Sequence, residues 1–120
     1  MKHAVLMIYV ENVKATQAFW TTYLGFTVEK TLDLGPSQSV VLNLEDNFRV
    51  QLFEKSFIEQ VSPEVSLAMP SIAIYVDNLE DYHQEVARAG LFISDISEHA
   101  GQRSFNFQDN EGHYLAAIER

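Results

Sequence analysis

The chain has 120 residues, no cysteine, 47% hydrophobic residues and a formal net charge of −9. These values indicate one compact globular domain and exclude disulfides, thiolate metal ligands and a thiol nucleophile. The negative charge and the lack of a long apolar run predict that neither nucleic acid nor a membrane is a partner.

A strand and a helix are predicted at the start of the chain. Residues 3–10 are apolar on both sides of an alternating pattern, which predicts a strand covered on both faces. Asn12 is a suitable N-cap for a helix over 13–24, and Gly25 is expected to end it. The helix stripe expected to pack on the sheet consists of Ala15, Phe19 and Tyr23.

Three further strands are expected after the helix. They are predicted over 26–33, 39–44 and 48–54. The turn Glu45-Asp46-Asn47 joins the last two as a hairpin. Residues 55–70 have no clean period and are expected to link two halves of the chain, with a turn of helix as an alternative over 57–61.

The second half of the chain repeats the plan of the first. The sequence Ile8-Tyr9-Val10-Glu11-Asn12-Val13 returns as Ile74-Tyr75-Val76-Asp77-Asn78-Leu79. Asn78 is therefore expected to cap a second helix, which Gly90 ends. The strands of this half are predicted over 71–76, 91–96, 103–108 and 113–118, with a polar turn over 97–101.

The repeat predicts an α+β fold of two tandem βαβββ units, residues 1–54 and 71–120, in a single domain. Each unit has one helix on one face of its sheet, which leaves the other face free. The two free faces are expected to curve as mixed sheets around a central hollow. The sequence leaves open whether the units pair within one chain or across a dimer.

Local motifs in both halves also match those of a known family. They are Val10-Glu11-Asn12, Phe19-Trp20, Leu24-Gly25-Phe26, Val76-Asp77-Asn78-Leu79, Ala89-Gly90 and Phe107-Gln108-Asp109-Asn110-Glu111-Gly112-His113. With the order of elements, they resemble the vicinal-oxygen-chelate superfamily. This group includes glyoxalase I, fosfomycin-resistance enzymes, extradiol dioxygenases, methylmalonyl-CoA epimerase and bleomycin-resistance proteins. The resemblance implies the fold but no single activity, because the scaffold carries several chemistries.

The resemblance also implies four candidate metal-ligand positions, early in the first strand and late in the last strand of each unit. By motif, these positions are Val5, Gln51, Ser71 and Ala116. Enzymes of the family place His, Gln or Glu there. Val5 and Ala116 carry no ligand atom, Ser71 is a poor ligand, and Gln51 alone offers a suitable oxygen. We therefore predict that the chain binds no metal and no other cofactor.

Other polar side chains offer little to a metal site. His3 shares a strand side with Val5, but a histidine at a chain end is more often solvated than a ligand. Glu54 and Glu119 each lie three residues beyond the pocket-facing positions 51 and 116, so both are expected to be solvated on the opposite face. The remaining histidines are expected on a helix surface, in the turn over 97–101 and pointing away from the hollow: His83, His99 and His113.

Strand alternation predicts which residues line the hollow. The ligand-binding pocket is expected to consist of Val5, Met7, Tyr9, Arg49, Gln51, Phe53, Ser71, Tyr75, Tyr114 and Ala116, with His3, Ala73 and Ile118 at its margins. This wall is aromatic and apolar with a few polar groups, which is typical of a small-molecule pocket. As an alternative, these side chains fill the hollow themselves or pack in a dimer interface.

The leading hypothesis is a metal-free small-molecule-binding protein that resembles the bleomycin-resistance type. That type sequesters a cationic, aromatic drug as a dimer, so the resemblance implies a homodimer with a role in antibiotic resistance. The absence of cysteine and of a signal-peptide pattern favours a cytoplasmic location. The acidic surface and four aromatic residues fit a cationic ligand: Tyr9, Trp20, Phe53 and Tyr75. The alternatives are a metal-dependent lyase, isomerase or dioxygenase using His3, Gln51 and a residue of a partner chain, and a regulatory or interaction module.

Overall fold

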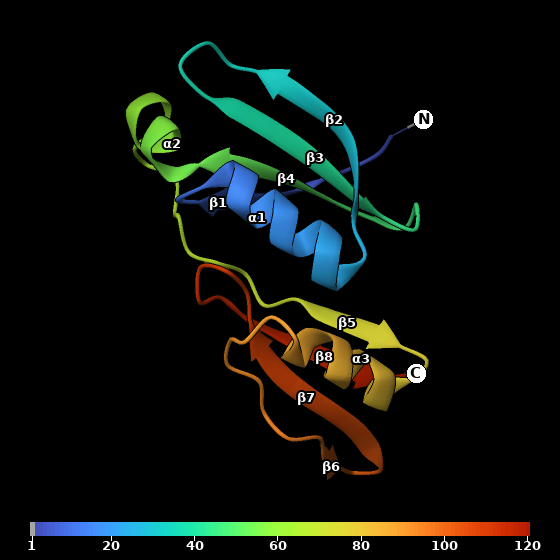
Figure 1. The fold of residues 1–120 in the computed structure, drawn as a ribbon. Helices are drawn as coiled ribbons and strands as arrows, with labels where there is room; N and C mark the ends of the chain where they lie inside the picture. The colour runs from blue at the N-terminus through green and yellow to red at the C-terminus, as the bar shows by residue number, and fades with distance from the viewer. Residues whose placement is uncertain (1) are drawn as a thin grey trace. The chain divides into compact units, whose positions relative to one another are not determined.

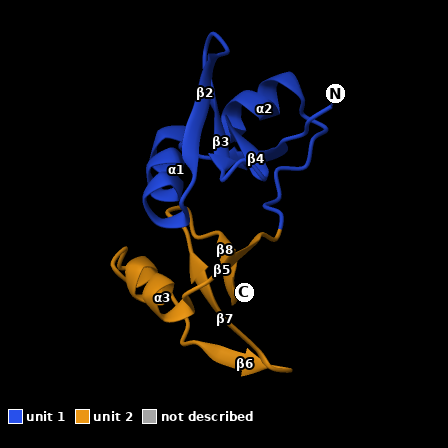
Figure 2. Cartoon of the chain, turned by 90° about the vertical axis from the view of Figure 1, so that its right-hand side faces the viewer, with its two compact units in different colours: residues 1–70 blue, residues 71–120 orange. Residues whose placement is uncertain are grey.

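In the computed structural model, which describes residues 2–120, the chain forms two four-stranded sheets with the same strand order (Figure 1). The chain divides into unit 1, which ends at Pro70, and unit 2, Ser71–Arg120 (Figure 2). Each sheet is mixed, because its first strand runs parallel to its last while the other pairs are antiparallel. The predicted α+β class and the βαβββ order are confirmed.

Unit 1 is ordered β1-β4-β3-β2 across its sheet. Its elements are β1 (Leu6–Val10), α1 (Val13–Phe19), the π-helical segment η1 (Trp20–Leu24), β2 (Thr27–Asp33), β3 (Gln38–Leu44), β4 (Phe48–Glu54) and α2 (Lys55–Val61). Helix α2 packs on β4 and β1 through the buried Ile58. The segment expected to link the two halves therefore begins with a helix that belongs to unit 1.

Unit 2 repeats this arrangement as β5-β8-β7-β6. Its elements are β5 (Ala73–Val76), α3 (Leu79–Ala87), β6 (Ser97–His99), β7 (Gln102–Gln108) and β8 (Tyr114–Glu119). Its core lies between α3 and the sheet, where Leu79, Phe107 and Ala117 are fully buried. Within residues 2–120, no helix is both long and apolar enough to cross a lipid bilayer.

The two helices begin as the repeated motif predicts. The Asn12 side chain accepts a hydrogen bond of 2.9 Å from the Ala15 backbone N–H, and Asn78 accepts one of 3.1 Å from that of Asp81. Each cap satisfies a donor that the first helical turn leaves without a partner, which stabilises a helix by about 1 kcal/mol. Gly25 follows η1 with a left-handed φ of 88°, so it ends the helical segment as predicted.

The buried stripe of the first helix differs from the prediction. Ala15 is exposed, and the side chains that face the sheet are Val13, Thr16, Phe19, Trp20 and Leu24. Trp20 is the largest of them and is fully buried, so its apolar area decides which side of the helix turns inward. The sheet contributes Ile8, Val10, Leu42, Val50 and Leu52 to this core.

The expected coverage of β1 on both faces is wrong for the side opposite this core. Met7 is 46% exposed and Tyr9 is half-buried, whereas Ile8 and Val10 on the helix side are buried. The alternation of β1 therefore separates a core face from an accessible face.

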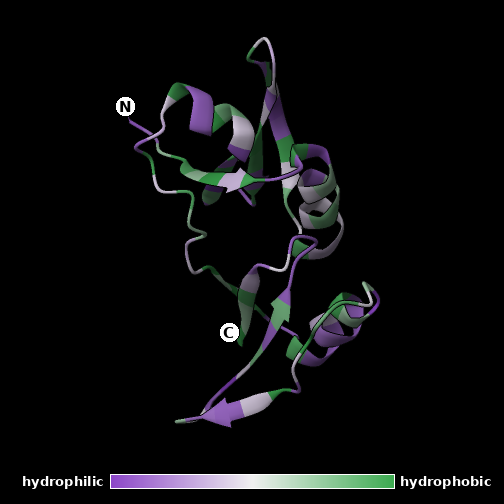
Figure 3. Ribbon diagram, turned by 90° about the vertical axis from the view of Figure 1, so that its left-hand side faces the viewer, coloured by the Kyte–Doolittle hydropathy of each residue, from purple (hydrophilic) through white to green (hydrophobic). Residues whose placement is uncertain are grey.

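The strand predicted over 91–96 is also wrong. Residues 92–94 meet β7 only briefly, around the isolated bridge between Ile93 and Phe107. The edge strand is instead β6, which includes His99 and lies in the predicted turn over 97–101. Ala100 and Gly101 turn the chain with φ values of 52° and 80°, as two-residue hairpin turns require. Figure 3 shows the end of β6 in hydrophilic purple, which explains why no apolar alternation marked it.

The turn before β8 is organised by one buried carboxylate. Asp109 is 1% exposed and accepts hydrogen bonds of 2.9 and 3.0 Å from the backbone N–H groups of Glu111 and His113. The Nδ1 atom of His113 also lies 3.1 Å from the second carboxylate oxygen. The Asp-Asn-Glu-Gly-His motif is thus a turn whose aspartate replaces water as the partner of backbone donors.

Candidate ligand-binding site

One face of the unit 1 sheet carries the candidate site. Across the sheet, Met7 pairs with Gln51, Gln51 with Val41, and Val41 with Lys30. Residues paired in register point to the same side of a sheet. Because Ile8 and Leu52 pair on the α1 side, this row lies on the opposite, accessible face.

A hollow of about 210 Å³ lies on this face, and we call it the sheet hollow. It is lined by His3, Ala4, Val5, Glu29, Lys30, Val41, Arg49 and Gln51. A shallower hollow of about 460 Å³ shares His3, Ala4, Val5 and Arg49 with it. The structure therefore brings together three residues of the expected pocket, Val5, Arg49 and Gln51, with His3 at their margin.

The other expected pocket residues of unit 1 lie further along the same face. Tyr9 pairs in register with Phe53, and their ring centroids are 6.1 Å apart. This pair follows the Met7–Gln51 pair along β1 and β4. Trp20 is different, because it is fully buried in the helix-side core, where its ring lies tilted against that of Phe26. The expected role of Trp20 in ligand contact is therefore wrong.

The expected pocket residues of unit 2 occupy their own sheet. Tyr75 and Tyr114 are 56% and 61% exposed, and the Tyr114 ring meets that of Phe92 edge-on at 5.9 Å. Ala73 pairs in register with Ala116, and Ser71 is exposed just before β5. These residues make an exposed, partly aromatic sheet face.

The polar centre of the sheet hollow is fixed by a buried hydroxyl. The Gln51 side-chain N–H donates to Ser39 Oγ over 2.9 Å, and Ser39 Oγ donates to the Leu52 carbonyl oxygen over 2.9 Å. Ser39 is fully buried. One N–H of the Gln51 amide is therefore committed to the protein, and its second N–H and its carbonyl oxygen remain to meet a ligand.

The side chains at the four family ligand positions do not fit a divalent metal. Val5 and Ala116 provide no donor atom, Ser71 is an exposed hydroxyl, and Gln51 is held by Ser39. A metal site needs three or four converging donors. Among residues 2–120, no three His, Cys, Asp or Glu side chains are grouped so that they could hold a metal ion.

A bulge in β2 adds two residues that the sequence did not reveal. The register between β2 and β3 shifts between Val28 and Lys30, so Glu29 is the extra residue. A bulge lets neighbouring side chains share a face. Glu29 accepts hydrogen bonds from Arg49 Nε at 2.9 Å and from Asn43 Nδ2 at 3.2 Å. Both Glu29 and Lys30 consequently line the sheet hollow.

Val41 was also missing from the expected pocket, although the hairpin turn over 45–47 contained the signal for it. Strands β3 and β4 pair from Leu44 and Phe48 outward, which sets Val41 opposite Gln51. Counting residues outward from the turn along both strands therefore identifies Val41 as the partner of Gln51. The bulge at Glu29 has no comparable signal, because the residues around it have ordinary strand composition.

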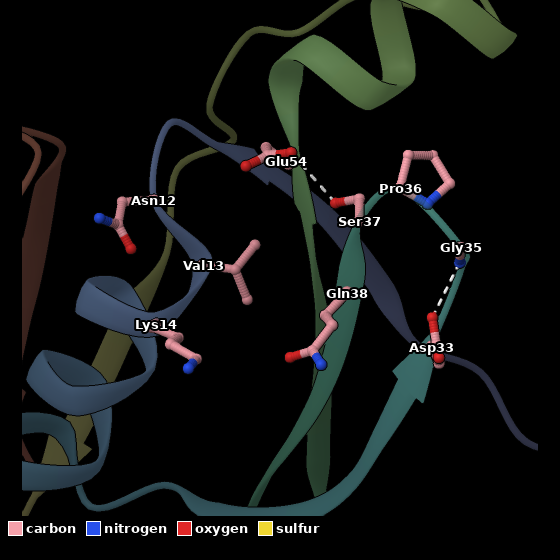
Figure 4. A pocket seen from close by; sticks show the side chains of 9 residues that line it. All are labelled: Asn12, Val13, Lys14, Asp33, Gly35, Pro36, Ser37, Gln38 and Glu54. Carbon is pink, nitrogen blue, oxygen red and sulfur yellow. Dashed lines mark hydrogen bonds between the residues drawn. The ribbon is translucent and has the colours of Figure 1, made fainter.

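A second pocket of about 380 Å³ lies at the other end of unit 1 and contains none of the expected site residues. Figure 4 shows Glu54 accepting a hydrogen bond from Ser37 and Asp33 accepting one from the Gly35 N–H, at 3.1 and 2.8 Å. These carboxylates hold the turn between β2 and β3. Glu54 is thus not simply solvated, and neither is Glu119, which pairs with Arg103 at 3.2 Å.

Comparisons with known proteins agree with this architecture. TioX from Micromonospora sp. ML1 is 15% identical, with 99% of this chain and 98% of that chain covered and a TM-score of 0.80. Lactoylglutathione lyase from Agrobacterium tumefaciens is 15% identical, with 98% and 94% covered and a TM-score of 0.73. A glyoxylase/bleomycin resistance protein/dioxygenase domain from Frankia sp. EAN1pec is 13% identical, with 99% and 97% covered and a TM-score of 0.78.

Sequence identities this low establish a shared fold but no shared activity or ligand. No curated protein sequence matches the chain. The family model described as Glyoxalase/Bleomycin resistance protein/Dioxygenase superfamily matches residues 1–116, nearly the whole chain. The chain therefore belongs to the Glyoxalase/Bleomycin resistance protein/Dioxygenase superfamily.

Proposed function

We propose that this chain is a metal-free small-molecule-binding member of its superfamily, with its ligand held in the sheet hollow of unit 1. One observation carries the proposal: a hollow lies at the positions where the family has metal ligands, but the side chains there do not form a set of metal donors. Val5 stands at one donor position, and Gln51 is tied to Ser39 at the other. What remains is a partly apolar recess with a few fixed polar groups.

The lining favours a ligand with a flat apolar body. Ala4 and Val5 supply aliphatic contacts, the buried Val41 lies beneath them, and the exposed Met7 and half-buried Tyr9 extend this surface along β1. Aromatic and thioether side chains adapt well to ring-bearing molecules. The Gln51 carbonyl oxygen adds an acceptor that can orient a ligand donor.

Binding is favoured over metal-assisted chemistry by the donor set. One similar structure is named a lyase, and metal-assisted catalysis requires an ion that polarises a substrate oxygen. The corresponding positions here provide one amide oxygen, which does not hold an ion against water. A homodimer and a role in antibiotic resistance remain part of the proposal, as do the exposed rings of Tyr75 and Tyr114 as ligand contacts on their own sheet.

A nuclear magnetic resonance titration with the neutral arene 2-naphthalenemethanol tests the proposal. In isotope-labelled protein, we expect shifts centred on the backbone amides of Ala4 and Val41 and on the Gln51 side-chain amide. Val5→Phe should fill the hollow and abolish these shifts. Val28→Phe is the matched control, because Val28 is also partly exposed but lies outside the sheet hollow.

The proposal is contradicted if the arene produces no saturable shifts. It is equally contradicted if the shifts lie elsewhere in the chain, or if Val5→Phe binds the arene as well as Val28→Phe does.

A further inference from the structure

The lining of the sheet hollow is richer in cations than the chain as a whole. The chain carries a net charge of −9 with only eight Lys and Arg residues. Two of these eight, Lys30 and Arg49, line the sheet hollow together with His3, while Glu29 is its one carboxylate. A charge that lines a recess acts on a ligand more strongly than distant surface charges, which salt screens.

Arg49 is compensated by the protein itself. The Arg49 Nε atom lies 2.9 Å from Glu29 Oε1, and its Nη2 atom lies 3.5 Å from Asp46 Oδ1. The same Glu29 oxygen also accepts a hydrogen bond from Asn43. One oxygen of Glu29 thus accepts hydrogen bonds from two donors, and the Arg49 guanidinium is paired with two carboxylates, those of Glu29 and Asp46.

Lys30 is left as the uncompensated cation of the hollow. Over residues 2–120, its ammonium group forms no ion pair with a carboxylate. The bulge puts Lys30 on the accessible face, where it pairs in register with Val41 beside Gln51. Glu29, its neighbour in sequence, turns to Arg49 and does not neutralise it.

We propose that the ligand of the sheet hollow carries a carboxylate, which the Lys30 ammonium binds while the apolar body of the ligand lies on Ala4 and Val5. This inference rests on the proposed function and narrows its ligand class to organic acids. It replaces the expectation of a cationic ligand, which used the charge of the whole chain and not the charge at the site.

Three arenes that differ only in their polar group test the inference: 2-naphthoate, 2-naphthalenemethanol and 2-naphthylmethylammonium. Their dissociation constants are measured by the same resonance shifts on the wild-type protein. We expect 2-naphthoate to bind roughly threefold to fivefold more tightly than the alcohol at low salt, and the ammonium compound to bind most weakly.

Two variants with the same change in net charge locate the effect. Lys30→Gln should reduce the affinity for 2-naphthoate to that for the alcohol and leave the alcohol unaffected. Lys14→Gln is the matched control, because Lys14 is also exposed and lies in the second pocket of unit 1. This control should retain the preference for the acid.

The possible results distinguish failure of this inference from failure of the proposed function. The acidic-ligand inference is overturned if the wild-type protein binds the acid no better than the alcohol. It is also overturned if Lys30→Gln retains the preference, or if Lys14→Gln loses it to the same extent. In those cases the arenes still bind in the hollow, so the proposed function stands. Failure of all three arenes to bind overturns the proposed function and this inference with it.

Discussion

The Ser39 hydroxyl accepts a hydrogen bond of 2.9 Å from the Gln51 side-chain amide and donates one of 2.9 Å to the Leu52 carbonyl oxygen. Gln51 alone, of the four family ligand positions, has an oxygen suited to a metal. Its orientation is set by a side chain of the neighbouring strand β3. This relationship links the packing of β3 and β4 directly to the chemistry of the sheet hollow.

Ser39→Ala should lower the free energy of unfolding by about 1–2 kcal/mol, because it removes one buried hydrogen bond and leaves the Gln51 amide without its partner. Denaturant unfolding measures the effect. Ser37→Ala is the control, since Ser37 is half-buried and makes one bond to Glu54. It should cost clearly less, and an equal loss in both variants would contradict the special role of Ser39.

The ion pair between Arg103 and Glu80 should make stability depend on acid pH. A hydrogen bond from the Arg103 side chain holds the pKa of Glu80 below its ordinary value. A carboxyl with a lowered pKa in the folded state contributes stability above its unfolded pKa and loses it as the pH falls through the folded pKa. The advantage of the wild-type protein over Glu80→Gln should therefore be full above the unfolded pKa of glutamate, about 4.3, and shrink progressively as the pH falls below it.

Thermal unfolding midpoints measured across this pH range, at low salt, check the prediction. Glu64→Gln serves as the control, because Glu64 is exposed and forms no salt bridge within the described part of the chain. A gap between wild type and Glu80→Gln that stays constant down to strongly acidic pH would show that the pair does not contribute in this way.

Tyr82→Phe should leave the free energy of unfolding unchanged or raise it by up to about 1 kcal/mol. The Tyr82 hydroxyl is buried and has no hydrogen-bond partner among residues 2–120, and this burial raises the pKa of Tyr82 above its ordinary value. Its ring packs on Phe105 and Phe107, and phenylalanine retains those contacts. A loss of more than about 1 kcal/mol in denaturant unfolding would instead reveal a bound water that the hydroxyl needs.

Local backbone signals allowed much of the fold to be predicted from the sequence. Asn12 and Asn78 cap their helices because a short polar side chain can meet the backbone N–H three residues later. Gly25 and Gly90 both adopt the left-handed conformation expected after a helix. These signals depend on single residues, so they can be identified without knowledge of tertiary contacts.

Features that depend on packing were predicted less well. The inward side of α1 is decided by the volume of Trp20 against the sheet, and helical spacing alone correctly selected Phe19 but not its buried neighbours. Strand β6 consists of Ser-Glu-His and is defined by its pairing with β7, so its composition gives no strand pattern. Tertiary contacts override intrinsic preference at both places.

The candidate site was predictable only in part. Val5, Arg49 and Gln51 line one hollow, and strand parity alone groups them, because side chains alternate regularly wherever a strand has no bulge. Lys30 depends on a one-residue bulge that changes parity within β2, and Ser39 depends on a contact across strands. Neither has a signature in the order of residues along the chain.

The most direct test of the central claim is a measurement of metal content. The claim is that this member of the superfamily binds small molecules without a metal. The protein is purified without chelator, incubated with zinc, manganese, nickel or iron(II), and desalted before elemental analysis by mass spectrometry. The claim predicts far less than one metal ion per chain in every sample and the same content in Gln51→Ala. One tightly retained ion per chain that Gln51→Ala releases would contradict it.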